Sequence, residues 1–299
     1  MIPFVRDFEF EYGRADQVSP LIRRVIANNP GPFTFTGTGT YIVGHGEVAV
    51  IDPGPDLPEH LEAILAAVNG ETVRTILVTH NHADHSPLAG PLQQATGAPT
   101  YGCPMRHPPG AMAVKVEDDH DLGFVADHDL CGGGVVSGPG WTFEAIPTPG
   151  HTSNHVCYAL GEENALFSGD HIMGWSTTVI VPPDGDMDAY FHSLDRIAAR
   201  QFKTLWPTHG PPVREPAPFI EAHKAHRLER ERQILEMLSR GLSTIGDMVP
   251  VMYAAVDKRL YPAAAQSVLA HMIRLAGEGV IASSDPRPGL TSLYRLSAR

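Results

Sequence analysis

Side chains that bind metal ions are concentrated in one short segment of the sequence. Residues 80–85 read HNHADH, so that His80, His82, Asp84 and His85 lie within six residues. The apolar stretch TILVT precedes them and predicts a strand that ends at His80. A helix would spread these four side chains around its axis, whereas a tight loop after a strand can turn them toward one point. Because imidazole and carboxylate groups are common ligands of Zn²⁺, the segment predicts a zinc site.

Three more ligand-type side chains follow later predicted strands, each beside glycine or proline. They are His151 in TPGHTSNH, Asp170 in FSGDH and His209 in PTHG. Glycine and proline allow the sharp turns that bring such side chains together. Because these ligands are more than one ion needs, we predict two zinc ions per chain. The predicted ligands are His80, His82 and His151 for the first ion, Asp84, His85 and His209 for the second, and Asp170 as a bridge between them.

Two metal ions held about 3.5–4 Å apart activate a hydroxide between them at neutral pH and polarise the carbonyl or phosphoryl oxygen under attack. The predicted chemistry is therefore hydrolysis, with Asp84 and Asp170 as catalytic carboxylates. Two other hypotheses stay open. Similar ligands bind a single iron ion in some oxygenases, and a purely structural metal site would suit a nucleic-acid-binding regulator.

The predicted strands and helices place these ligands at strand ends. Apolar alternation interrupted by glycines predicts short strands within residues 33–52, and helical spacing predicts a helix over 57–68. Further helices are expected within 87–96 and over 187–200, and further strands over 75–80, near 99–102 and over 141–151, 155–160, 164–170 and 203–210. Residues 103–140 show weak periodicity, and we expect irregular structure with a short strand or two. Ligands at strand ends, above layered sheets with helices outside, are typical of an αββα sandwich, an α+β fold.

The proline-rich stretch PTHGPPVREPAPF marks a junction between two domains. We predict a catalytic domain over residues 1–222 and a second domain over 223–299, where helices and two short strands around DPRPG match a winged helix-turn-helix. The last helix of this domain offers few basic or amide side chains, which argues against duplex DNA as a partner. We expect the domain to line the active-site mouth and to offer Lys224, Arg227 or Arg230 to an anionic substrate.

The composition excludes several classes of protein. Of the 299 residues, 42% are hydrophobic and 19% are charged, as in soluble globular proteins, and no apolar run is long enough to predict a membrane span. Of the 22 Lys+Arg and 34 Asp+Glu residues, 11 and 8 lie in residues 221–299, which leaves 11 and 26 before them. The net charge of −12 is therefore concentrated in the first 220 residues, and it argues against nonspecific binding of nucleic acid.

Three cysteines, Cys103, Cys131 and Cys157, are odd in number and widely spaced. They predict neither a disulfide framework nor a cysteine-rich zinc site. The N-terminal sequence lacks the apolar core of a signal peptide. We therefore expect a cytoplasmic protein with unpaired cysteines.

The metal-binding motifs resemble, in order, those of the metallo-β-lactamase superfamily of hydrolases. The matching segments are THNHADH, PTPGHTSNH, FSGDH and PTHG, and IDPGP resembles the first motif of the superfamily. The resemblance implies that Asp52 in IDPGP steadies the metal-binding loop instead of binding metal. One major subclass of zinc β-lactamases uses a cysteine ligand, and no cysteine follows Asp170 here. Persulfide dioxygenases keep similar motifs with one iron, so that alternative stays open.

Longer segments resemble the β-lactamase-like protein 2 group of this superfamily over nearly the whole chain. They are GTGTYIVG, GDHIMGWSTTVIVPPDGDMDAY and the C-terminal winged helix. Well-known members of the group cut single-stranded RNA, so the resemblance implies an endoribonuclease. Hydrolysis of a small-molecule thioester or ester, as by glyoxalase II-like enzymes, is the alternative. Gly39 departs from the asparagine usual in the group.

Residues that follow the FSGD motif are predicted to contact substrate: His171, Ser176, Thr177 and Thr178. His155, like His171, lies next to a predicted ligand motif and is expected to support a ligand or touch substrate. The remaining histidines are expected to be surface groups: His45, His60, His107, His120, His128, His192, His223, His226 and His271.

Overall fold

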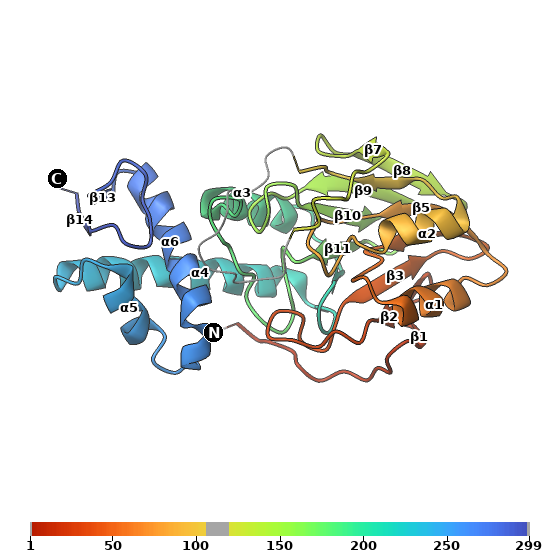
Figure 1. Ribbon diagram of the computed structural model, residues 1–299, viewed down its shortest axis with the longest axis horizontal. Helices are drawn as coiled ribbons and strands as arrows, with labels where there is room; N and C mark the ends of the chain where they lie inside the picture. The colour runs from red at the N-terminus through yellow and green to blue at the C-terminus, as the bar shows by residue number, and fades with distance from the viewer. Residues whose placement is uncertain (1, 106–119, 298–299) are drawn as a thin grey trace.

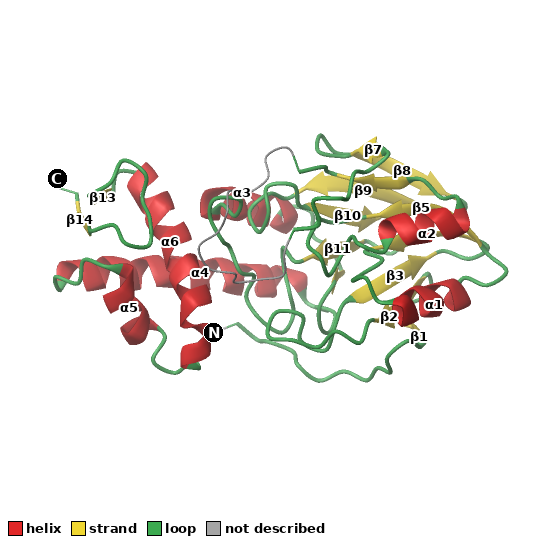
Figure 2. Cartoon of the chain, viewed as in Figure 1, coloured by secondary structure: helices red, strands yellow, loops and turns green. Residues whose placement is uncertain are grey.

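Two β-sheets packed face to face, with helices on their outer sides, form the larger part of the molecule (Figures 1 and 2). The structure is a computed structural model that describes residues 2–105 and 120–297. A smaller unit of helices and a two-stranded sheet follows at the C-terminus. The predicted αββα sandwich followed by a winged-helix unit is confirmed.

The first sheet has seven strands that lie side by side in chain order. They are β1 (Ala15–Gln17), β2 (Ile22–Ile26), β3 (Gly39–Val43), β4 (Glu47–Ile51), β5 (Thr72–Leu77), β6 (Thr100–Gly102) and β7 (His128–Asp129). Pairing is antiparallel from β1 to β4 and parallel from β4 to β7. Parallel neighbours need a crossover connection. Helices α1 (Pro58–Ala67) and α2 (Ala89–Thr96) supply the first two crossovers and cover the outer face of this sheet (Figure 1).

The second sheet has five strands in the order β12-β11-β10-β9-β8. Their bounds are β8 (Gly134–Gly138), β9 (Trp141–Pro147), β10 (Val156–Leu160), β11 (Ala165–Gly169) and β12 (Thr204–Pro207). Only β11 and β12 pair in parallel, and α3 (Met187–Ala198) connects them. The predicted hairpin is present as β10 and β11, paired antiparallel with Tyr158 opposite Phe167.

Alternate side chains along each strand explain the layers. On β3, Tyr41 and Val43 point into the core between the sheets, whereas Ile42 points toward α1 and α2. On β10, Tyr158 belongs to the same central core, and Cys157 faces the layer that contains α3. Both strands are buried throughout, because each face of each sheet is covered.

The C-terminal unit is joined to the sandwich by one long helix. Helix α4 runs without interruption from Pro216 to Ser239, so the predicted domain boundary at 222/223 lies inside it. Its first part packs Phe219 and Ile220 against the second sheet and α3, and its later part packs Ile234 and Met237 in a separate core. That core also includes α5 (Ile245–Met252), α6 (Tyr261–Gly277), β13 (Ile281–Ser283) and β14 (Tyr294–Leu296).

Two predictions about the rest of the chain are wrong. Cys103 and Cys131 form a disulfide, because the fold brings β6 beside β7 although 28 residues separate the two cysteines; Cys157 alone is free and buried. His60, His223 and His271 are buried inside packed helices instead of lying on the surface. The expectation for His107 lies outside the described residues, as does part of the predicted irregular segment 103–140. No helix in the described ranges is both long and apolar enough to span a membrane.

Candidate metal centre

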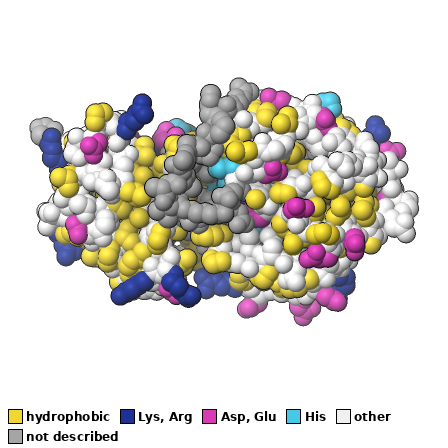
Figure 3. Space-filling view, in the orientation of Figure 1, with side chains coloured by type: hydrophobic (Ala, Val, Ile, Leu, Met, Phe, Trp, Pro, Cys, Tyr) yellow, Lys and Arg dark blue, Asp and Glu magenta, His cyan; other side chains and the backbone are white. Residues whose placement is uncertain are grey.

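The strand ends that carry the predicted ligands meet at one edge of the sandwich. Strands β9 and β11 end on the same side of the second sheet, since each pairs antiparallel with β10. The first sheet reaches this edge too, where the Val156 amide donates to the Thr79 carbonyl at 2.8 Å. Figure 3 shows histidine side chains in a recess near the middle of the molecule's face.

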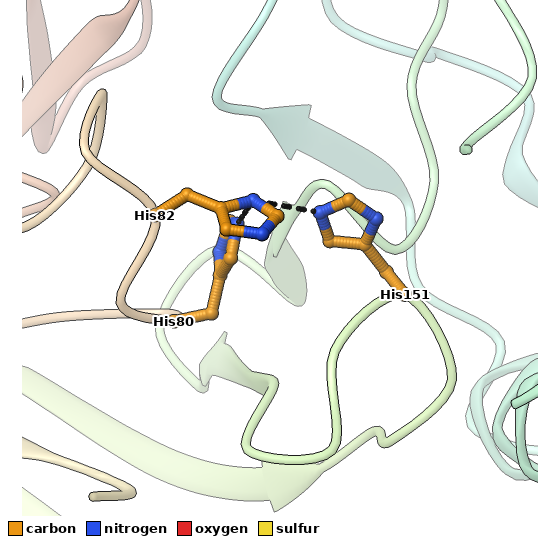
Figure 4. A group of neighbouring side chains, drawn as sticks. All are labelled: His80, His82 and His151. Atoms are coloured by element: carbon orange, nitrogen blue, oxygen red, sulfur yellow. Dashed lines mark hydrogen bonds between the residues drawn. The ribbon is translucent and has the colours of Figure 1, made fainter. Parts of the chain in front are cut away.

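Three histidines form the first group of ligand-type atoms (Figure 4). His80 Nε2 lies 2.9 Å from His82 Nδ1, which lies 3.3 Å from His151 Nε2. Three nitrogens bound to one tetrahedral Zn²⁺ at ~2.1 Å would lie roughly 3.4 Å apart. All three side chains are buried. The arrangement therefore fits a single metal ion between them.

A second group lies beside the first and contains Asp84, His85 and His209. His209 Nε2 lies 3.0 Å from an Asp84 oxygen, and His85 Nε2 lies 3.5 Å from the same oxygen. Asp170 lies between the two groups: its Oδ1 is 3.5 Å from His209 Nε2, and its Oδ2 is 3.9 Å from His151 Nε2. The structure thus brings all seven predicted ligands together. Two groups of three have the predicted composition, and a third, His80, His85 and Asp170, connects them.

Two buried atoms in this cluster lack hydrogen-bond partners among the described residues. They are His85 Nε2 and Asp170 Oδ1, which face each other at 3.7 Å. A buried polar atom without a partner costs about 1–3 kcal/mol, so such atoms call for an explanation. A metal ion would satisfy both, and the donor set fits it: imidazole nitrogens and carboxylate oxygens only.

Asp52 organises the histidines from behind, as the family resemblance implied. Its carboxylate is fully buried and accepts from the Thr79 amide at 2.7 Å, the Thr79 hydroxyl at 2.8 Å, the Thr208 hydroxyl at 2.8 Å and His85 Nδ1 at 2.9 Å. Since the Thr79 hydroxyl donates to Asp52, it accepts from His80 Nδ1 at 3.1 Å. His80 and His85 are therefore held with Nε2 directed toward the cluster.

Backbone carbonyls orient two other histidines in the same manner. His151 Nδ1 donates to the Val179 carbonyl at 2.7 Å, and His209 Nδ1 donates to the Gly37 carbonyl at 3.3 Å. These contacts fix each ring with Nε2 toward the cluster, and this nitrogen can bind metal once it is unprotonated.

The electrostatics of the cluster divide along the two groups. Burial, reinforced by the neighbouring histidines, lowers the pKa of His80 well below its usual value, and burial likewise lowers the pKa of His82 and His151. Burial opposes the charged form of Asp84, but His85 and His209 outweigh it and lower the pKa of Asp84 to about 2. Burial opposes the charged forms of His85 and His209 too, but the carboxylates outweigh it: Asp84 and Asp170 raise the pKa of His85 well above its usual value and also raise that of His209. The first group therefore has the neutral imidazoles that metal binding needs, whereas metal binding at the second group would displace protons from His85 and His209.

The predicted substrate residues divide into two pairs. His171 is fully buried against Tyr190, and Thr178 is buried with its hydroxyl 2.6 Å from the Asp170 carbonyl and 3.0 Å from the His171 carbonyl. The Thr178 hydroxyl is therefore engaged with the chain around Asp170, whereas neither ring nitrogen of His171 has a hydrogen-bond partner among the described residues; the substrate roles of both stay predictions. Ser176 and Thr177 are half-buried, and their substrate role stays a prediction.

Further residues outside the ligand set support the metal-binding loop, and of these the sequence indicated only His155. His155 Nε2 accepts from the Asp170 amide at 3.1 Å, so this ring holds the turn at Asp170. Asn81 and Asp121 exchange hydrogen bonds of 2.6 and 3.1 Å, and His120 packs its ring 4.7 Å from that of His82. Residue 121 is far from 81 in the sequence, and the HNHADH motif itself contains no signal of this partner.

Gly39, the departure from the related group, lies where the backbone approaches the site closely. Its amide donates to the Thr208 carbonyl at 2.8 Å, and a Cβ at this position would lie 3.1 Å from that oxygen and 3.2 Å from the Arg24 side chain. Glycine therefore fits beside the strand end that carries His209.

An αββα sandwich with buried histidines and aspartates gathered at one sheet edge defines a class of metal-dependent hydrolases. Comparison with known families agrees. Residues 34–209 match the family described as Metallo-beta-lactamase superfamily, and residues 244–287 match the Beta-lactamase associated winged helix domain. The chain therefore belongs to the metallo-beta-lactamase superfamily and is a metal-dependent hydrolase with a His/Asp metal-binding cluster.

Individual relatives span most of the chain. A Beta-lactamase-like protein 2 homolog of Caenorhabditis elegans is 31% identical over 276 residues, which cover 89% of this chain and 88% of the relative. An Atrochrysone carboxyl ACP thioesterase of Aspergillus chevalieri is 30% identical over 278 residues, covering 89% and 84%. A crystal structure of a metallo-beta-lactamase family protein from Thermus thermophilus superposes with a TM-score of 0.75 at 21% identity, covering 94% of this chain and all of that one, and supports the fold.

Proposed function

We propose that this hydrolase binds two zinc ions and cleaves an ester or thioester bond. The observation that carries the dinuclear site is the position of Asp170, whose two oxygens face the two neighbouring groups of histidines at 3.5–3.9 Å. A mononuclear iron site would leave the Asp84, His85 and His209 group without a role. When bound, two zinc ions activate a water molecule at neutral pH and polarise the oxygen of the bond under attack.

The residues of the chain determine where that chemistry takes place. Asp84 and Asp170 supply ionised carboxylate oxygens that can accept a hydrogen bond from the attacking water. His155, with the Asp170 amide on its Nε2, fixes the turn from which the Asp170 carboxylate projects. Because the ligand side chains are buried, the electrostatic interactions between them are stronger than they would be in water.

The basic side chains of α4 that were expected to meet an anionic substrate are engaged in other contacts, which favours an uncharged scissile group over RNA. Lys224 pairs with Asp195 at 2.5 Å, Arg227 is buried on the Thr178 carbonyl, and Arg230 donates to the Met252 carbonyl at 3.1 Å. These engaged cations do not offer a path for a phosphate backbone. On the face drawn in Figure 3, Lys and Arg side chains lie mainly toward the margins. A relative named as an ACP thioesterase supports the same choice.

Metal analysis and a substrate panel test the proposal. Protein purified without chelator should contain two zinc ions per chain, and the zinc-loaded enzyme should hydrolyse acyl thioesters or aryl esters and leave labelled single-stranded RNA intact. Cleavage of the RNA, with inert esters and thioesters, would overturn the substrate class. One iron and no zinc would overturn the dinuclear site and support an oxygenase.

Asp170→Asn is the matched variant for this assay. The amide keeps the size of the side chain but weakens the negative charge between the two groups, so we expect kcat/KM to fall by roughly two orders of magnitude or more with the fold retained. Circular dichroism checks the fold. Full activity with normal zinc content would exclude the bridging role.

A further inference from the structure

One short segment outside the ligand motifs touches two of the proposed metal ligands. His151 Nδ1 donates to the Val179 carbonyl at 2.7 Å, and the Thr178 hydroxyl lies 2.6 Å from the Asp170 carbonyl. The segment 178–179 belongs to neither a helix nor a strand. Something else must therefore fix its position, because the orientation of both ligands depends on it.

Arg227 of helix α4 is the group that contacts this segment. Its Nη2 donates to the Thr178 carbonyl, and its guanidinium lies 5.3 Å from the centre of the Tyr190 ring. The Tyr190 hydroxyl in turn donates to the His171 carbonyl at 3.1 Å, next to Asp170. One side chain from α4 thus supports the chain on both sides of the loop that follows Asp170.

The environment of Arg227 is unusual for a structural arginine. The side chain is only 2% exposed, and no carboxylate pairs with it in the described parts of the chain; the nearby Glu231 is engaged by Arg274 at 2.9 Å and by His271 at 3.1 Å. Burying a charge without an opposite charge is unfavourable. The Arg227 guanidinium instead contacts the Thr178 carbonyl and the Tyr190 ring.

We infer that Arg227 is a positioning residue for the metal centre, through which α4 holds the Thr178–Val179 segment and thereby the orientation of His151 and Asp170. The inference rests on the proposed metal-binding function. Groups that orient metal ligands typically contribute 10–100-fold to metal affinity or activity, by analogy with the partners that hold ligand histidines in other zinc sites. The C-terminal unit is then part of the active-site scaffold.

Arg230 provides a matched control on the same helix. It also donates to a backbone carbonyl, that of Met252 at 3.1 Å, and also lies over an aromatic ring, that of Tyr253 at 4.3 Å. Its contacts are with the C-terminal unit and not with the segment beside the ligands. Loss of Arg230 therefore removes similar interactions without touching the metal centre.

The test compares Arg227→Met, Arg227→Lys and Arg230→Met in the full-length protein. Zinc affinity is measured by chelator competition on metal-free protein, and the visible spectrum of the Co²⁺-substituted protein reports the ligand geometry. We expect Arg227→Met to weaken zinc binding by about 10–100-fold and to change the Co²⁺ spectrum. Arg227→Lys should recover part of the affinity, and Arg230→Met should match the wild type within about threefold even where its melting temperature falls.

Two outcomes separate the inference from the proposed function. Wild-type protein that binds two zinc ions, with Arg227→Met equal to it in affinity and in spectrum, would overturn the positioning role and leave the proposed function intact. Wild-type protein that binds no zinc would overturn both. If Arg227→Met does not fold, Arg227→Lys is compared with the wild type; equal zinc affinity and an unchanged Co²⁺ spectrum in that variant would also overturn the inference.

Discussion

At the scale of single residues, Asp52 has the most demanding role outside the ligand set. It adopts a left-handed backbone conformation with φ of 48°, which is uncommon for residues other than glycine. The cost of such a conformation is offset by the hydrogen bonds that its buried carboxylate accepts from Thr79, Thr208 and His85. The left-handed backbone at Asp52 thus places its carboxylate as a hydrogen-bond acceptor behind the metal-binding histidines.

Asp52→Asn should weaken metal binding without removing a ligand. The asparagine keeps the size of the side chain and tolerates the backbone conformation. Its NH₂ group only donates, however, so the one remaining oxygen cannot accept all the hydrogen bonds from Thr79 and His85. We expect zinc affinity to fall by about 10–100-fold, measured by chelator competition. Asp56→Asn, an exposed position in the same turn, is the control and should have no effect. Equal affinities of the two variants would contradict the role given to Asp52.

At the scale of elements, the disulfide closes a loop that returns to the metal site. Cys103 follows β6 and Cys131 follows β7, and the segment between them includes Asp121, which accepts from Ser86 at 2.8 Å and bonds to Asn81. Asn154 donates to both the Cys103 carbonyl at 2.9 Å and the Asn81 side chain at 3.0 Å. The disulfide therefore constrains two segments that contact the ligand loop and its neighbour Asn154: the one that contains Asp121 and the one that contains Cys103.

Cys131→Ser should lower the free energy of unfolding by roughly 3.5 kcal/mol, because a loop of 28 residues is no longer closed in the unfolded chain. Urea unfolding of metal-free protein measures the change. A dithiol reductant should destabilise the wild type by a similar amount and leave the variant unchanged. A wild type that is indifferent to the reductant would show that this cross-link contributes no stability.

At the scale of the whole molecule, one continuous helix joins two cores. Phe219 and Ile220 belong to the core beneath the second sheet, whereas Ile234 and Met237 belong to the C-terminal core. His271, Glu231 and Arg274 form a buried polar network between α4 and α6, and Arg274 also reaches Asp188 on α3 at 3.3 Å. The C-terminal unit is therefore packed on the sandwich and not merely tethered to it.

A fragment of residues 1–220 should be unstable for this reason. The cut lies inside α4 and removes Arg227 together with the helix that covers part of the apolar surface. We expect aggregation on size-exclusion chromatography and little bound zinc. A soluble fragment with the turnover of the full chain would contradict this view of the helix.

The full chain should show no tight duplex DNA binding with a steep salt dependence.

Buried neutral histidines should make the whole protein sensitive to acid. Burial lowers the pKa of His60 to about 4, and burial together with Arg227 lowers that of His223 to about 3. Below pH ~6.5 the unfolded chain binds protons that the folded state does not, so each such histidine costs ~1.4 kcal/mol of stability per pH unit, until the pH reaches its folded pKa. This contribution is absent above pH ~6.5 and grows as the pH falls.

The His60→Gln variant isolates one of these contributions. Between pH 6.5 and 5, metal-free wild type should lose about 2 kcal/mol more unfolding free energy than this variant, measured by urea titration. His192→Gln, which changes an exposed histidine, should follow the wild type. Parallel pH dependence of wild type and His60→Gln would show that His60 does not remain neutral in the folded protein.

The ligand loop and the strands that lead to it could be predicted from the order of the residues alone. In HNHADH the ligand types lie next to one another along the chain, so a single turn after an apolar strand suffices to bring them together. The pairing of β10 with β11 was predictable too, because a short turn joins two apolar runs. Local spacing carries this information, since neighbours in the sequence are neighbours in space.

The distant residues that support the site could not be predicted in this way, because they meet only when the elements pack together. Arg227 was expected to meet an anionic substrate, yet the packing of α4 buries it on Thr178, 49 residues away. Cys103 and Cys131 look unpaired until β6 and β7 lie side by side. Thr178 reads as a substrate contact, but the fold turns its hydroxyl inward. Periodicity and motif spacing describe local order, whereas these contacts arise from how separate elements pack.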